Sequence, residues 1–182
     1  MAINPQDRKQ LISLARAAVA SAVRRQPASR PGAATGLLAE KRGCFVTLTR
    51  GGDLRGCIGT FQPDRPLGEM IVEMGRAAAQ DPRFVANPIT PAELDELTVE
   101  VSVLSPLEPT GEPEKLDIGR HGIYVVKGQR SGCFLPEVAT GQGWDAVEFL
   151  RYCCSHKAGL PSDAWRDPDA KVYLFTSEKF DS

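Results

Sequence analysis

The sequence predicts an α+β fold in which helices flank mainly antiparallel sheets. Its strand-like runs come in pairs joined by short turns, as in β-hairpins, and its helical segments stand between these pairs. The chain has 182 residues, of which 42% are hydrophobic and 25% charged, which is sufficient for one compact domain. We therefore expect a single domain over residues 1–182, with an N-terminal helix at 4–25, a connector at 27–36 and a core at 43–176.

The first predicted element is an amphipathic helix. Asn4 suits the N-cap, Pro5 the first helical position and Asp7 the first turn. One face of this helix carries the apolar residues Leu11, Ala15, Ala18 and Ala22. The following segment, PASRPGAATG, lacks periodicity and is rich in proline, glycine and small residues, so we expect it to be an exposed connector.

A β-hairpin is predicted over residues 43–61. The β-rich runs GCFVTLTR and DLRGCIGTF are separated by Gly51 and Gly52, which suit the positive φ angles of a two-residue turn. Such a turn places Arg50 opposite Asp53. Apolar residues at positions 67, 71, 74 and 78 then predict a helix over 66–80, which lies on the hairpin and ends before the DPRF turn at 81–84.

A short helix and a strand are predicted in the middle of the chain. Thr90, Pro91 and Glu93 have the spacing of a capping box with proline at the first helical position, so a helix begins there. In LTVEVSVLS, residues 97–105, apolar and polar residues alternate with the period of a half-buried strand.

The C-terminal part predicts a second hairpin, one helix and a last strand. In GIYVVKGQRSGCFLPEVA, the segment GQRSG separates two strand-like runs. Residues 143–158 have helical spacing, with Gly159 suited to the position after the helix. The run KVYLF, residues 171–175, predicts the final strand.

Composition argues against several classes of function. A formal net charge of −1 provides no basic surface for nucleic acid or for an anionic membrane. No apolar run approaches the ~20 residues of a membrane span, and the first residues lack the apolar region of a signal peptide, so we expect a cytoplasmic protein. Phosphate-loop, dinucleotide-binding, zinc-protease and serine-hydrolase motifs are missing, and no cofactor is expected. The five cysteines contain no CxxC pair, so we expect free thiols.

Cys57 is the first candidate for chemistry. Gly56 and Gly59 have no side chains, so a ligand or a backbone segment can approach the thiol closely, and Arg55 supplies a positive charge nearby. On a regular strand Arg55 and Cys57 share a face. A free cysteine is also a small apolar residue that packs well in a core, and this alternative stays open.

Histidines and carboxylates supply the candidate partners for this thiol. The two histidines are His121, which precedes a predicted strand, and His156, near the end of a predicted helix. Cys153 and His156 could share a helix face and complete a zinc site with Cys57 and His121, but the spacing fits no known zinc pattern, and we expect no metal. The candidate carboxylates are Glu100 and Glu137, each of which could equally be a solvated surface group.

Several segments in a fixed order resemble the AMMECR-domain family, also called the AmmeMemoRadiSam system protein A family. They are FVTL (45–48), LRGCIGTF (54–61), DPRF (81–84), VEVSVL (99–104), HGIYV (121–125), LPEVA (135–139), Trp144 and KAGL (157–160). The resemblance runs from about residue 6 to the last strand, and the LRGCIG hexapeptide is its most specific part.

The resemblance implies an α+β fold with two unequal lobes and a cleft between them, to which the RGCIG segment contributes. It also implies partners, because the family is grouped with a MEMO-type protein and a radical SAM protein. The family's motif positions fall on Arg55, Gly56, Cys57, Gly59, Asp81, Arg83, Glu100, Ser102, His121, Glu137 and Lys157. The family commonly has LPQVA where this chain has LPEVA, so Glu137 could serve as a base or pair with a nearby cation.

These observations lead to three hypotheses. In an enzyme, Cys57 is the nucleophile, His121 the base, Glu137 the group that orients the base, and Arg55 binds an anionic part of the substrate. In a binding module, the cleft accepts a carboxylate, a phosphate or a peptide terminus. The substrate-binding residues would be Arg55, Gly56, Gly59, Arg83 and Lys157. The alternative is a non-catalytic adaptor that contacts the MEMO-type or radical SAM protein.

Overall fold

The computed structural model describes residues 2–28, 32 and 35–182, and the chain forms two compact units. The first consists of Met1–Leu104 with Glu178–Ser182, and the second of Ser105–Ser177. The positions of the two units relative to one another are not determined, so each is described by itself. The cleft expected between two lobes stays a prediction.

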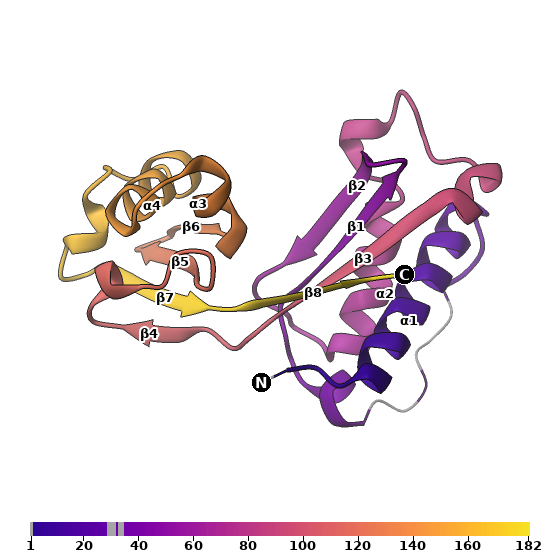
Figure 1. The fold of residues 1–182 in the computed structure, drawn as a ribbon, viewed down its shortest axis with the longest axis horizontal. Helices are drawn as coiled ribbons and strands as arrows, with labels where there is room; N and C mark the ends of the chain where they lie inside the picture. Colours follow the sequence, from indigo (N-terminus) through magenta and orange to yellow (C-terminus); the bar gives the residue numbers. More distant parts are fainter. Residues whose placement is uncertain (1, 29–31, 33–34) are drawn as a thin grey trace. The chain divides into compact units, whose positions relative to one another are not determined.

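The first unit is a four-stranded antiparallel sheet with two helices on one face. Its strands are β1 (Cys44–Arg50), β2 (Asp53–Thr60), β3 (Leu97–Leu104) and β8 (Ser177–Asp181), in the order β2-β1-β3-β8 (Figure 1). The helices α1 (Pro5–Val23) and α2 (Leu67–Ala78) pack against the sheet. Alternate residues of β1 are buried under these helices, while Phe45, Thr47 and Thr49 point to the opposite, half-exposed face.

The first hairpin forms as predicted, but it contains a bulge. Gly51 and Gly52 have φ angles of 57° and 90°, which a primed turn requires, and Arg50 pairs with Asp53. The register then shifts, since Leu48 pairs with Gly56 whereas Thr49 pairs with Leu54. Arg55 is therefore the extra residue of a β-bulge and has no partner across the ladder.

The segments between the strands agree with the sequence in most places. Helix α2 occupies most of the predicted range 66–80, and the capping box over Thr90 and Glu93 opens the helical turn η3 (Pro91–Glu96). Asp81 caps the turn η2 (Pro82–Phe84), because its side chain accepts a hydrogen bond from the Arg83 N–H. The connector expected at 27–36 falls partly outside the described residues and is followed by the turn η1 (Gly36–Ala39).

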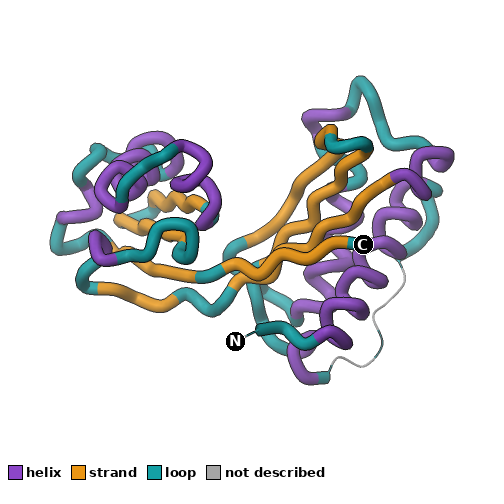
Figure 2. The backbone as a smooth tube through the Cα atoms, viewed as in Figure 1, coloured by secondary structure: helices purple, strands orange, loops and turns teal. Residues whose placement is uncertain are grey.

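The second unit has its own four-stranded antiparallel sheet, with strands in the order β4-β7-β5-β6 (Figure 1). Figure 2 shows the strands of both units in orange and their helices in purple. They are β4 (Glu108–Thr110), β5 (Gly122–Lys127), β6 (Arg130–Phe134) and β7 (Lys171–Phe175). Helices α3 (Pro136–Gln142) and α4 (Ala146–Tyr152) bury Phe149 and Leu150 in its core. Two further helical turns are η4 (Pro113–Lys115) and η6 (Ala164–Arg166).

Several details of the second unit and the C-terminus differ from the prediction. The second hairpin turns at 128–129, because Lys127 pairs with Arg130, so the separator is shorter than GQRSG. The helix predicted over 143–158 was wrong at its start, since Gly143 has a φ angle of 68° and ends α3. Its last part, Cys153–Lys157, is a π-helical turn, labelled η5. The strands β4 and β8 were not anticipated.

The α+β class with mainly antiparallel sheets and flanking helices is confirmed. Among the described residues, none of the helices has the length and apolar character to cross a membrane.

Candidate functional site

Cys57 lies half-exposed on β2, on the sheet face opposite α1 and α2. It pairs directly with Thr47 of β1, whose Oγ donates a hydrogen bond to the Cys57 Sγ over 3.2 Å. Thr47 also pairs with Glu100 of β3, so the three side chains form one row across three neighbouring strands. The row continues to β8, where the Lys179 Nζ lies 3.8 Å from the Glu100 Oε1. We call Cys57, Thr47, Glu100 and Lys179 the polar row.

The backbone of Cys57 is held by the turn that follows α2. The Cys57 N–H donates to the Asp81 Oδ2 over 2.9 Å, and the Arg83 Nη2 donates to the Cys57 carbonyl oxygen over 3.1 Å. The Arg83 Nη2 also donates to the Asp81 Oδ2 over 2.6 Å. Both backbone polar groups of Cys57 are thus satisfied by one ion pair, which fixes the position of the thiol.

The electrostatics of this ion pair are those of a buried carboxylate and an exposed cation. Asp81 is buried, and hydrogen bonds from Arg83 hold the pKa of its carboxyl well below the usual range. The same hydrogen bonds, followed by the charges of Asp81 and Cys57, raise the pKa of Arg83. The Arg83 side chain is 58% exposed. Within the described residues its Nη1 makes no hydrogen bond, so this nitrogen can bind an anion.

The two glycines beside Cys57 make room for the protein itself. A Cβ on Gly56 would lie 2.0 Å from the carbonyl oxygen of Ala78, at the end of α2. A Cβ on Gly59 would lie 2.2 Å from the ring of Phe45. Contacts this short are not tolerated by real side chains, so both positions require glycine for packing. The Cys57 thiol is accessible because it lies on the half-exposed face of the sheet, and the two glycines do not create this access.

Arg55 is engaged in an internal network. The residue is 8% exposed, and its Nη2 donates to the Glu93 Oε1 over 3.0 Å while its Nη1 donates to the Asn87 carbonyl oxygen over 3.2 Å. Hydrogen bonds from Thr90, together with the charge of Arg55, lower the pKa of Glu93. Arg55 therefore ties the loop before β3 to the bulge of β2, and a ligand would have to compete with Glu93 for it.

The other predicted site residues belong to the second unit. The His121 Nδ1 accepts a hydrogen bond from the Asp117 N–H over 3.0 Å, so neutral His121 carries its proton on Nε2. Glu137 lies in the first turn of α3, and the Lys157 Nζ lies 5.4 Å from the centre of the Phe134 ring. The structure brings Arg83 into contact with Cys57. His121, Glu137 and Lys157 lie in the other unit, so their distances from Cys57 are not determined.

The remaining cysteines are poorly suited to nucleophilic chemistry. Burial raises the pKa of the Cys44 thiol to about 12 and that of the Cys133 thiol to about 11. It also raises the pKa of Cys153 and of Cys154. Throughout the described part of the chain, no group of three or more histidine, cysteine or acidic side chains is placed to hold a metal ion.

Sequence reasoning missed Thr47, which is the side chain bound to the thiol. Counting back from the Arg50–Asp53 pair along a regular hairpin places Thr47 opposite Gly56. The bulge at Arg55 moves the register by one residue and brings Thr47 opposite Cys57. Lys179 was missed because β8 was not anticipated.

These features define an α+β protein with two antiparallel sheets and a half-exposed cysteine in an LRGCIG segment. The chain belongs to the AMMECR1 family, whose model matches residues 12–180. It is 49% identical to Protein TK0174 of Thermococcus kodakarensis over 183 residues, which cover 94% of this chain and 88% of the relative. It is 50% identical to Protein MK0488 of Methanopyrus kandleri over 154 residues, covering 79% and 73% of the two chains.

A solved structure has the same fold. The crystal structure of the uncharacterized protein PH0010 from Pyrococcus horikoshii matches with a TM-score of 0.84 and 42% sequence identity. The match covers 99% of this chain and 93% of that chain. The fold is therefore shared nearly end to end.

Proposed function

We propose that the chain is an enzyme or ligand-binding protein that uses Cys57 as a covalent nucleophile toward a small anionic substrate. The observation that carries this proposal is the combination of a half-exposed thiol, a hydroxyl that donates to its sulfur, and an ion pair that holds its backbone. A hydrogen bond to sulfur and a nearby guanidinium both stabilise negative charge on a thiol.

In the proposed step, the Cys57 sulfur attacks an electrophilic carbon of the substrate. A bond forms between Sγ and that carbon, the leaving group departs with its electron pair, and the thiol proton passes to a base. Glu100 is the base that the first unit offers, because it pairs across the sheet with Thr47, the residue whose hydroxyl donates to the Cys57 sulfur. His121 suits this role less well, since its unprotonated nitrogen already accepts the Asp117 N–H.

Arg83 is the proposed anion-binding group, in place of Arg55. Its guanidinium is exposed, touches the backbone of Cys57 and keeps donors on Nη1, whereas Arg55 is buried against Glu93. An arginine with free planar donors recognises a carboxylate or phosphate.

Two alkylating reagents test the anion site. Iodoacetate is anionic and iodoacetamide is neutral, so the ratio of their rates at Cys57 measures attraction by a nearby cation. We expect Arg83→Gln to lower this ratio about tenfold and Arg83→Lys to retain most of it. Arg65→Gln, which removes an exposed arginine paired with Glu73, is the matched control and leaves the ratio unchanged. An unchanged ratio in Arg83→Gln contradicts the proposal.

Variants of the polar row test the proton path. We expect Thr47→Val and Glu100→Gln each to slow alkylation of Cys57 at pH 7 several-fold, while Thr47→Ser, which keeps the hydroxyl, retains the wild-type rate. The readout is the dependence of the rate on pH, which a purely structural role would not move. A pH profile that is identical in Glu100→Gln and wild type, but altered in His121→Ala, would return the role of base to His121.

A second candidate is an adaptor that contacts a MEMO-type or radical SAM protein, as the family resemblance implies. The segment it would use carries Val85, which is 80% exposed in a loop anchored by Arg55 and Asp81. If this loop docks a partner, Val85→Asp abolishes binding to the purified MEMO-type or radical SAM protein of the same organism. Binding of neither protein to the wild-type chain would rule out this adaptor function.

A further inference from the structure

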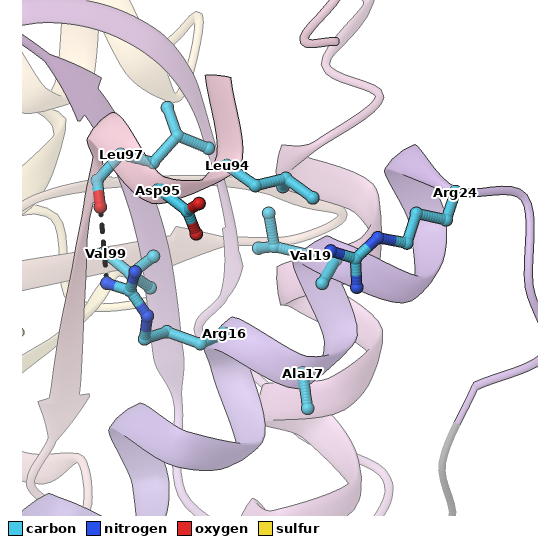
Figure 3. A pocket seen from close by; sticks show the side chains of 9 residues that line it. Arg16, Ala17, Val19, Arg24, Leu94, Asp95, Leu97 and Val99 are labelled. Atoms are coloured by element: carbon cyan, nitrogen blue, oxygen red, sulfur yellow. Dashed lines mark hydrogen bonds between the residues drawn. The ribbon is translucent and has the colours of Figure 1, made fainter. Parts of the chain in front are cut away.

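A cavity lies on the helix-covered side of the first sheet, so it is separate from the face that carries Cys57. It has a volume of about 240 Å³ and opens between the second half of α1, the turn η3 and the start of β3 (Figure 3). Pockets for drug-sized ligands measure about 300–1,000 Å³, so this cavity suits a smaller molecule.

The floor of the cavity is aliphatic. It is lined by Val19 of α1, Leu94 of η3, and Leu97 and Val99 of β3, all of which are buried in the first unit. An aliphatic group of a ligand would cover the small apolar area that these residues leave exposed, and its transfer out of water is favourable.

Three charged side chains line the same cavity. The Arg16 Nη1 donates to the Leu97 carbonyl oxygen over 3.3 Å and to the Ser182 Oγ over 2.7 Å, which holds its guanidinium in place (Figure 3). Asp95 and Arg24 also line the cavity. Both side chains are exposed, and among the residues that the structure describes neither makes a hydrogen bond or an ion pair, so one carboxylate and one guanidinium are available to a ligand.

We propose that this cavity binds a free aliphatic α-amino acid. The ammonium group would bind to the Asp95 carboxylate, the carboxylate to Arg24 and the remaining donors of Arg16, and the aliphatic side chain to the floor. An aliphatic α-amino acid carries one positive charge, one negative charge and an apolar side chain, and the cavity offers a partner for each of them. Asp95 disfavours ligands that carry only negative charge, and the two arginines disfavour ligands that carry only positive charge.

Titration of the full chain with L-leucine tests the proposal, with amide chemical shifts as the readout. We expect saturable shifts confined to α1, η3 and the start of β3. Asp95→Asn and Arg24→Gln each weaken binding about tenfold or more, as loss of a charge-assisted hydrogen bond implies. Arg25→Gln is the matched control, because Arg25 follows Arg24 in sequence but does not line the cavity.

Analogues that lack one charge sharpen the test. Isovalerate lacks the ammonium group and isoamylamine lacks the carboxylate, so both bind at least tenfold more weakly than L-leucine if the proposal holds. The proposal is overturned if L-leucine does not saturate, if isovalerate binds as tightly as L-leucine, or if Asp95→Asn binds L-leucine as the wild type does. Cys57→Ser keeps L-leucine binding, so this outcome is independent of the function proposed for Cys57.

Discussion

Gly56→Ala tests whether this glycine serves packing. The added Cβ lies 2.0 Å from the Ala78 carbonyl oxygen, and ordinary contact begins at 3.4 Å, so the end of α2 must move by about 1.4 Å. Overpacking of a core costs about 1–3 kcal/mol, and the obstacle here is backbone, so we expect a loss of about 3 kcal/mol. For a chain of this length that lowers the Tm by roughly 6–12 °C. The assay is thermal unfolding followed by circular dichroism.

The same substitution also disturbs the thiol site. The Ala78 carbonyl accepts the Asp81 N–H, so a displaced carbonyl moves Asp81, which binds the Cys57 N–H. Gly68→Ala is the matched control, because its Cβ meets Leu38 at an ordinary 3.6 Å and alanine favours the helix, so the protein is stabilised by about 0.5–1 kcal/mol. If Gly56→Ala melts within 1 °C of the wild type, the packing explanation for this glycine is refuted.

The remaining stability predictions concern the two buried carboxylates. The folded-state pKa of Asp81 lies below its unfolded value, so its stabilisation is complete above about pH 5 and is lost as the pH falls through and below about 4. In urea denaturation, the free energy of unfolding therefore falls more steeply from pH 7 to pH 3 in the wild type than in Asp81→Asn. Equal pH dependence in the two proteins contradicts this prediction. Glu93→Gln leaves the buried Arg55 charge without its carboxylate and costs about 3 kcal/mol in urea at pH 7. Arg55→Met in the Glu93→Gln background recovers part of that loss, and a lack of recovery argues against an unpaired charge as the cause.

The fold was predictable where local patterns decide it. The Gly51-Gly52 turn, the capping box at Thr90 and the alternation in the first half of β3 each depend on residues that are neighbours in sequence, and all three are present in the structure. The second half of β3 is buried throughout, Ser102 included. Helix α3 escaped prediction, because it is a short helix whose formation depends on packing in the second core.

The candidate site was predictable only in part, because its contacts join residues that are distant in sequence. Cys57 and Arg83 were identified from their segments, but their contact depends on Asp81, a buried carboxylate that joins strand β2 to the turn after α2. The expectation that Arg55 contacts a ligand assumed a regular strand. The bulge at Arg55 depends on Glu93, 38 residues away, and long-range pairing of this kind leaves no periodic signal in the sequence.

The most direct test of the central claim is the labelling of each cysteine by limiting iodoacetamide at pH 7, measured by peptide mass spectrometry. The structure predicts that Cys57 reacts at least tenfold faster than Cys133, which is half-exposed like Cys57 but whose pKa is raised to about 11 by burial. Labelling of Cys57 at or below the rate of Cys133 would contradict the claim that Cys57 is a reactive thiol.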